Sequence, residues 1–180
     1  MIIAEQLQLK PNFVIIEGPD GVGKTTLATV LACRLNAMYW HTDPMLEQYR
    51  HDEAILTNIE YNLCQLRRSV VLDRHWPSEC AYGPVFRPNA PKYDWHSLAH
   101  SIELMHGVYI FCNSKDGYKH QMATANKPLT EGEYHEVENR YEAISHAINE
   151  TPVKLIRYHR ENDGGAHCQE FLSKVYAALL

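Results

Sequence analysis

The chain has 180 residues, of which 45% are hydrophobic and 22% charged, and its net charge is −5. This length and composition are typical of a single soluble globular domain with a proper core. The negative charge argues against a broad nucleic-acid-binding surface, and no apolar run approaches the length of a membrane span. Five scattered cysteines without a C-x-x-C pair favour reduced thiols over disulfides or zinc ligands. Because the first residues also lack the layout of a signal peptide, we expect a cytoplasmic protein with no membrane or nucleic-acid partner.

Segments of strand character alternate with segments of helical periodicity, which predicts a three-layer α/β fold around a five-stranded parallel sheet. In chain order we expect a strand at 12–17, a helix at 24–36, a strand at 37–41, a helix at 45–66, a strand at 69–73, a helix at 95–105, a strand at 107–112, a helix opened by a capping box at 130–133, a strand at 153–158 and a closing helix.

The last two helices each carry an apolar stripe that should face the core. The first stripe consists of Tyr134, Val137, Tyr141, Ile144 and Ile148. The second consists of Phe171, Leu172, Val175, Tyr176 and Leu179.

Two stretches break the regular pattern. Residues 84–94 contain three prolines and should form an ordered loop, whereas residues 113–129 are polar and poorly periodic, as expected of a mobile lid. Both stretches follow predicted strands or lie near their ends, and ligands of open α/β sheets bind at the carboxyl ends of the strands.

The residues that follow the first predicted strand form a complete phosphate-binding loop. Gly18–Thr25 reads G-P-D-G-V-G-K-T, which matches G-x-x-x-x-G-K-[ST] between a strand and a helix. Glycines let backbone N–H groups surround phosphate oxygens, and the helix directs its positive end toward them. Lys24 can then reach the β- and γ-phosphates, and the Thr25 hydroxyl can ligate Mg²⁺. The sequence therefore predicts a P-loop NTPase fold that binds a nucleoside triphosphate.

A second motif follows the third predicted strand. Asp73 ends this strand and is followed by Arg74. A carboxylate at a buried strand end near the loop typically organises Mg²⁺, and the adjacent arginine can bind a second phosphate through two N–H groups. The alternative interpretation is a helix N-cap beside a surface cation.

Both motifs resemble those of the thymidylate kinase family. Residues 17–26 are similar to the family's E-G-x-D-G-x-G-K-T-T, and residues 73–82 to its D-R-[YH]-x-x-S-x-x-A-Y. Arg87 stands where many members have an arginine, and residues 134–141 resemble the helix that follows the lid. The resemblance implies one kinase domain over residues 1–180, with a lid at about 113–129, ATP and Mg²⁺ as donor and cofactor, and the possibility of a homodimer.

The family also implies roles for individual residues. Asp20 would approach the acceptor's sugar 3′-hydroxyl, Arg74 would bind its phosphate, and Tyr82 would crowd the sugar's 2′ position. Thr25 and Asp73 would serve Mg²⁺. The implied ATP-binding residues are Gly18, Asp20, Gly21, Val22, Gly23, Lys24, Thr25 and Thr26. The implied acceptor-binding residues are Asp20, Tyr49, Asp73, Arg74, Glu79, Tyr82 and Arg87.

The catalytic cations depart from the family pattern. The phosphate loop has no arginine at its variable positions, so the lid must supply the further cation. The lid has only lysines, and the nearest arginine is Arg140 on the following helix. The candidate catalytic residues are therefore Lys24, Arg74, Asp20, Lys115, Lys119 and Arg140, with Lys127 as a third lid lysine.

The base of the acceptor is left open. Glu79 stands where the family often has a small polar residue, and a carboxylate suits guanine or cytosine better than thymine. The competing interpretation pairs Glu79 with Arg50 or Arg87. Tyr49 and Tyr61 are both candidates for stacking on the base.

The leading hypothesis is a deoxynucleoside monophosphate kinase. A deoxynucleoside kinase is the nearest rival, and it would need a base such as Asp73 or Glu17 to take the hydroxyl proton. A nucleotide-binding switch without acceptor activity is the third possibility. Residues 126–129 read N-K-P-L, which lacks the acid of the guanine-reading N-K-x-D and argues against a GTPase.

Overall fold

The computed structural model describes residues 13–41, 61–63, 65, 68–87, 99–100, 102–103, 106–163 and 165–180. The expected helix at 45–66, with Tyr49 and Arg50, and the expected helix at 95–105 lie wholly or mostly outside the described residues.

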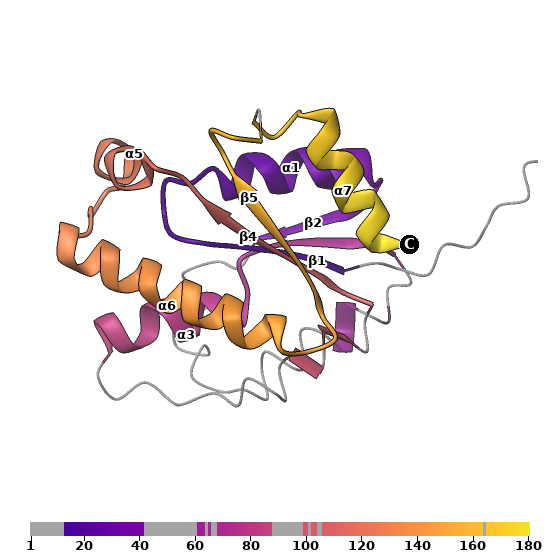
Figure 1. The fold of residues 1–180 in the computed structure, drawn as a ribbon, viewed down its shortest axis with the longest axis horizontal. Coiled ribbons are helices and arrows are strands. Elements are labelled where there is room, and N and C mark those ends of the chain that lie inside the picture. Colours follow the sequence, from indigo (N-terminus) through magenta and orange to yellow (C-terminus); the bar gives the residue numbers. More distant parts are fainter. Residues whose placement is uncertain are drawn as a thin grey trace, which may run out of the picture.

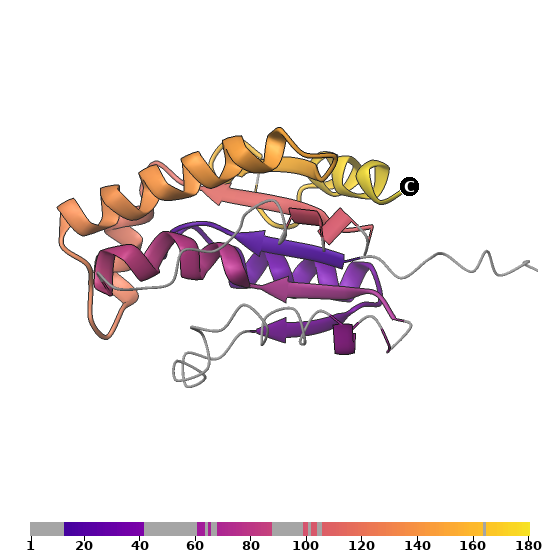
Figure 2. The same cartoon turned by 90° about the horizontal axis from the view of Figure 1, so that it is seen from below.

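Five parallel strands form one sheet in the order β2-β3-β1-β4-β5, as Figure 2 shows. Their bounds are β1 Phe13–Glu17, β2 Met38–His41, β3 Val70–Asp73, β4 Val108–Asn113 and β5 Lys154–His159. The central strands β1 and β3 are buried along their whole length, which explains why their sequences are continuous apolar runs ending in an acid. The predicted fold class is confirmed.

Helices cover both faces of this sheet (Figure 1). Helices α1 (Lys24–Arg34) and α7 (Gln169–Leu179) pack on one face, where Val14 and Ile16 of β1 point. Helices α3 (Trp76–Phe86) and α6 (Glu131–Asn149) pack on the other face, against Phe13 and Ile15. Successive β1 side chains therefore feed two separate cores.

The C-terminal helices form as their patterns predict. Thr130 and Glu133 make the reciprocal hydrogen bonds of a capping box at the start of α6, and all five residues of its predicted stripe are buried. In α7, Phe171, Leu172 and Val175 are buried, whereas Tyr176 is exposed. None of the helices in the described part of the chain is long and apolar enough to cross a membrane.

Two loop predictions were wrong in part. Residues 84–86 belong to α3 rather than to a loop, because Pro84 lies in the last turn and the helix ends two residues later. Within the predicted lid, Asn113 ends β4 and Gly117–Thr124 form helix α5. Its buried residues are Gly117 and Gln121, which share one face but give no apolar periodicity.

Candidate functional site

The phosphate loop joins β1 to α1 at the carboxyl end of the sheet, and its glycines have conformations that other residues rarely adopt. Gly18, Gly21 and Gly23 have φ values of 141°, 83° and 90°. A Cβ on Gly18 would lie 2.1 Å from the Cys112 carbonyl oxygen of β4. The chain therefore turns at Gly18 against the neighbouring strand, and Gly23 caps α1 so that the first N–H groups of the helix open into the loop.

Helix α5 packs directly on the tip of this loop. A Cβ on Gly21 would lie 2.4 Å from the Gly117 carbonyl oxygen and 2.7 Å from the Gln121 backbone nitrogen. The Tyr134 hydroxyl of α6 donates to the Asp20 carbonyl oxygen at 3.2 Å. The loop is thus held from outside by backbone and side-chain atoms of α5 and α6.

Replacing Gly21 by alanine should therefore destabilise the fold by about 1–3 kcal/mol and weaken ATP binding, because the added methyl group meets backbone rather than a flexible side chain. Gly132→Ala is the matched control: Gly132 lies in the first turn of α6, and an added Cβ would meet no described atom within 4 Å outside its chain neighbours and its own helix backbone. We expect the control to leave ATP binding unchanged. Thermal unfolding and nucleotide titration measure both effects, and wild-type behaviour of Gly21→Ala would contradict this packing.

Lys24 lies in the first turn of α1 with its side chain buried. Its Nζ donates to the Pro19 carbonyl oxygen and lies 3.9 Å from Asp20 Oδ1. Burial, followed by the positive charge of Arg74, lowers the pKa of Lys24 to about 8, although the charge of Asp20 opposes this shift. A buried lysine beside a second cation is an electrostatic arrangement that an anionic ligand would stabilise.

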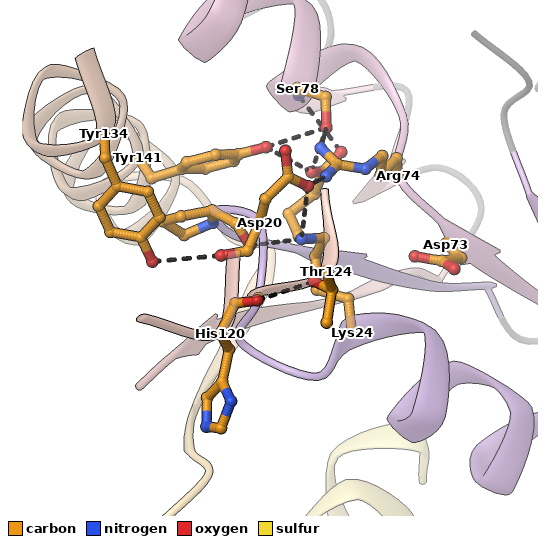
Figure 3. Close-up of polar contacts among 12 residues, drawn as sticks. Asp20, Lys24, Asp73, Arg74, Ser78, His120, Thr124, Tyr134 and Tyr141 are labelled. Atoms are coloured by element: carbon orange, nitrogen blue, oxygen red, sulfur yellow. Dashed lines mark hydrogen bonds and ion pairs between the residues drawn. The ribbon is translucent and has the colours of Figure 1, made fainter. Parts of the chain in front are cut away.

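Arg74 follows β3 directly and has a φ of 73°. Its guanidinium forms an ion pair with Asp20, donates to Ser78 Oγ at 3.2 Å and lies 5.2 Å above the centre of the Tyr82 ring. Figure 3 shows Asp20 between Lys24 and Arg74. Burial alone would raise the pKa of Asp20, but the charges of Arg74 and Lys24 outweigh it and hold that pKa below its usual value. The structure therefore brings together three of the predicted catalytic residues.

Asp73 is fully buried and lies apart from this group (Figure 3). Its Oδ2 accepts a hydrogen bond from the Tyr39 hydroxyl at 2.9 Å and lies 3.1 Å from His41 Nδ1. Its Oδ1 is buried without a hydrogen-bond partner among the described residues. Burial and the bond to Asp73 raise the pKa of Tyr39 to about 12, so Tyr39 stays a donor. The contribution of β2 to this carboxylate was not predicted from the sequence.

The remaining acceptor-binding candidates differ in their surroundings. Glu79 is buried and paired with Arg87, which confirms the competing interpretation of Glu79. Tyr61 is 63% exposed, and Tyr49 lies outside the described residues.

In the described part of the chain, no hydrogen bond or ion pair joins the candidate cations of the lid, or Arg140 on the following helix, to the phosphate loop. Lys115 and Lys127 are exposed, Lys119 pairs with Asp116 at 2.7 Å, and Arg140 pairs with Glu136 at 2.8 Å. The last two pairs lie within a single helix or at its cap. Lys119 and Arg140 therefore form local ion pairs rather than a pair with Asp20 of the loop.

A different arginine lies on the phosphate loop. Arg160 follows β5, and its Nη1 donates to the Gly21 carbonyl oxygen at 3.3 Å. The next residue, Glu161, accepts a hydrogen bond from Ser114 in the turn before α5. Sequence reasoning missed both residues, although their position after a parallel strand was a usable signal.

Glu17 is a third residue whose role was missed, because it was considered only as a possible base. It ends β1 and is fully buried. Its Oε1 accepts from the backbone N–H groups of His75 and Ser78 at 2.5 and 3.3 Å. Its Oε2 lies 2.7 and 3.0 Å from the hydroxyl oxygens of Ser78 and Tyr141, within hydrogen-bond distance of both. Glu17 thus ties β1 to the start of α3 and to α6.

The fold has close counterparts among solved structures. The YorR protein of Bacillus subtilis, in complex with phosphorylated GDP, matches with a TM-score of 0.72 and 13% identity over 92% of this chain and 94% of its own. Deoxyadenosine kinase from M. mycoides with products dCMP and dCDP matches with a TM-score of 0.62 and 16% identity over 92% and 99%. Thymidylate kinase from Ehrlichia chaffeensis matches with a TM-score of 0.56 and 17% identity over 94% and 100%. The chain has the fold of a P-loop kinase.

Sequence comparison adds less. No family model matches this chain. Gluconokinase from Gluconobacter oxydans is 26% identical over 132 residues, which are 69% of this chain and 58% of the relative. The Holliday junction branch migration complex subunit RuvB from Fervidobacterium nodosum is 48% identical over 50 residues, which are 27% of this chain and 14% of the relative. The chain therefore spans 58% or less of these two curated relatives.

Proposed function

We propose that this chain is a deoxynucleoside monophosphate kinase that transfers the γ-phosphoryl group of ATP to a deoxynucleoside monophosphate. The carrying observation is the second cation: Arg74 lies beside the phosphate loop and shares the Asp20 carboxylate with Lys24. A nucleoside has no charge for Arg74 to bind, whereas a monophosphate is an anion that a guanidinium can hold through two parallel hydrogen bonds.

The proposed chemistry needs alignment and charge neutralisation more than covalent assistance. The loop amides and Lys24 hold the donor phosphates. Arg74 holds the acceptor phosphate, whose oxygen is already a nucleophile. The Asp20 carboxylate lies between these two cations, in a place where negative charge is stabilised from both sides. By resemblance, Asp20 also reaches the acceptor's sugar hydroxyl.

The residues proposed for Mg²⁺ fit an oxygen-binding cation. Thr25 supplies a hydroxyl in the first turn of α1, and Asp73 has a buried Oδ1 that lacks a donor in the described part of the chain. Tyr39 and His41 hold the other carboxylate oxygen and so fix the orientation of Asp73. When bound, Mg²⁺ would neutralise charge on the donor phosphates.

Tyr82 provides a test of the acceptor sugar. Its ring lies below the Arg74 guanidinium and makes an edge-to-face contact with Tyr141, with ring centres of the two tyrosines 6.1 Å apart. If this ring crowds the 2′ position, Tyr82→Ala should lower the preference for deoxy over ribo monophosphates about tenfold or more. Tyr82→Phe keeps the ring and should leave the ratio unchanged. The ratio of kcat/KM values for a dNMP and its NMP measures this, and an unaltered ratio in Tyr82→Ala would exclude the steric role.

The rival nucleoside kinase needs a free general base, and the described carboxylates offer little support for one. Glu17 is buried and already takes part in four hydrogen bonds with the protein. Asp73 is held by Tyr39 and His41.

The pairing of Glu79 with Arg87 removes the reason to prefer guanine or cytosine over thymine as the base of the acceptor. The base of the acceptor therefore stays open, with dTMP by resemblance and dGMP or another dNMP as alternatives.

Coupled ADP release across deoxynucleoside monophosphates, ribonucleoside monophosphates and nucleosides tests the proposal. We expect robust turnover with at least one dNMP and none with nucleosides. Turnover with nucleosides alone would favour the rival kinase, and ATP binding without acceptor-dependent ADP release would favour a switch.

A further inference from the structure

Three buried oxygens form a closed triangle next to the acceptor arginine. Glu17 Oε2 lies 2.7 Å from Ser78 Oγ and 3.0 Å from Tyr141 Oη, and the two hydroxyl oxygens are 2.9 Å apart. Figure 3 shows the Ser78 and Tyr141 hydroxyls beside the Arg74 guanidinium. Each side of the triangle lies within the distance range of an O–H···O hydrogen bond, and three such bonds need three protons.

Counting protons shows that the two hydroxyls cannot fill three sides. Arg74 only donates, so its contact with Ser78 Oγ uses one lone pair and supplies nothing to the triangle. Ser78 and Tyr141 bring one proton each. If both donated to an ionised Glu17, the contact between the hydroxyls would join two lone pairs. If one hydroxyl donated to the other, one side at Glu17 would lack a proton.

One more proton on Glu17 Oε2 satisfies every contact. The three O–H groups then donate around the triangle in one direction, and each oxygen donates once and accepts once within it. The other carboxyl oxygen, Oε1, accepts two backbone N–H groups, from His75 and Ser78, as a carbonyl oxygen does. The geometry therefore matches a neutral carboxylic acid.

We propose that Glu17 is a protonated positioning residue, which completes the hydrogen-bonded triangle with Ser78 and Tyr141 and holds Ser78 against Arg74 without adding negative charge. A neutral Glu17 leaves Asp20 as the carboxylate paired with the guanidinium. The positive potential of Arg74 is then available to an acceptor phosphate. This consequence for substrate rests on the proposed function, whereas the protonation itself does not.

The surroundings of Glu17 support this state. Its complete burial is the largest influence and raises its pKa, although the charge of Arg74 and the three hydrogen-bonding residues act in the opposite direction. The titratable and charged groups that face Glu17 are Lys24 on α1, Arg74 and His75 after β3, Tyr109 and Cys112 on β4, and Tyr141 on α6. Burial raises the pKa of Tyr109, Cys112 and Tyr141, so these three remain neutral.

Glu17→Gln tests the protonation directly. Its amide can donate to both hydroxyls while its carbonyl oxygen keeps the two backbone donors, so the variant should fold. Glu142→Gln is the control, since Glu142 is exposed on α6 and pairs with Arg157. Infrared difference spectra at neutral pH should show the carbonyl band of a protonated acid that is absent only from Glu17→Gln. A spectrum without that band would overturn the proposal, whatever the enzyme's activity.

The same variant predicts a defined pH dependence of stability. A carboxyl group whose pKa is raised in the folded state stabilises the protein below its unfolded value of about 4.3, and this contribution is lost as pH rises through the folded pKa. Wild type should therefore lose stability relative to Glu17→Gln as pH rises, until the folded pKa is passed. A difference in Tm that is constant from acid to alkaline pH would contradict the proposal.

Kinetics test the positioning role separately. At a pH above the folded pKa of Glu17, the acceptor KM of wild type should rise about threefold to tenfold, whereas that of Glu17→Gln should stay flat. Glu17→Leu should raise the acceptor KM at every pH because Ser78 loses its support. If the infrared band is present but Glu17→Leu leaves the acceptor KM unchanged and the wild-type KM does not rise with pH, the positioning role is wrong. If the band is present and no dNMP is phosphorylated, the proposed function fails while protonation stands.

Discussion

Arg74→Ala is expected to lower kcat/KM for the acceptor monophosphate by about 10²–10³-fold, while ATP binding stays near that of wild type. The reason is that Arg74 lies next to the phosphate loop, after β3 rather than within the loop, and pairs with Asp20 of that loop. Its guanidinium is oriented by Ser78 and by the Tyr82 ring, so it is already in position to bind a phosphate.

Arg74→Lys separates charge from geometry. Lysine retains the charge but cannot form two parallel hydrogen bonds to a phosphate, so this variant should recover only part of the loss. Steady-state kinetics with varied acceptor and with varied ATP measure the two effects. If Arg74→Ala leaves the acceptor's kcat/KM unchanged, or mainly impairs ATP binding, the assignment of the acceptor site is wrong.

Lys24→Met should lower kcat by about 10²–10³-fold, because it removes the buried cation that we propose holds the donor phosphates. The same substitution should leave the thermal stability unchanged or raise it. With the pKa of Lys24 lowered to about 8, the folded protein carries a poorly solvated cation at neutral pH. We therefore expect Lys24→Met to unfold at a Tm equal to or above that of wild type at pH 7.

The pH dependence of this difference has a definite sign. Between about pH 8 and 10.5 the unfolded chain binds more protons at Lys24 than the folded chain, so wild-type stability rises relative to Lys24→Met. In wild type the KM for ATP should also rise above about pH 8, as free Lys24 loses its proton. The Glu17 effect falls on the acceptor KM instead, so the two titrations are distinguishable. Lower stability of Lys24→Met at pH 7 would contradict the electrostatic account.

The sequence predicted the sheet and the phosphate loop because their signals are local. A buried parallel strand is a continuous apolar run, and the loop glycines must have positive φ, so both leave a pattern over a few residues. The capping box of α6 is equally local. Asp73 and Arg74 could be placed at the same edge because every parallel strand of the sheet ends there.

The features that the sequence did not predict correctly depend mostly on contacts between segments that are distant in sequence. Helix α5 buries a glycine and a glutamine against the loop, so its packing leaves no apolar period. The lid lysines carried the expected charge, but Asp116 is close enough in sequence to satisfy Lys119. Arg160 reaches Gly21 across 139 positions of sequence, and Glu17 reaches Tyr141 across 124. Such pairs follow from the strand order, which residue spacing alone does not provide.

Following the label of γ-labelled ATP with a dNMP and with the matching deoxynucleoside tests the central claim most directly. If Lys24 holds the donor and Arg74 the acceptor phosphate, the label should appear in the deoxynucleoside diphosphate, and Arg74→Ala should lose that product. Label in a monophosphate made from the nucleoside would contradict the claim in favour of a nucleoside kinase. Label found solely in inorganic phosphate, with or without acceptor, would contradict acceptor phosphorylation altogether.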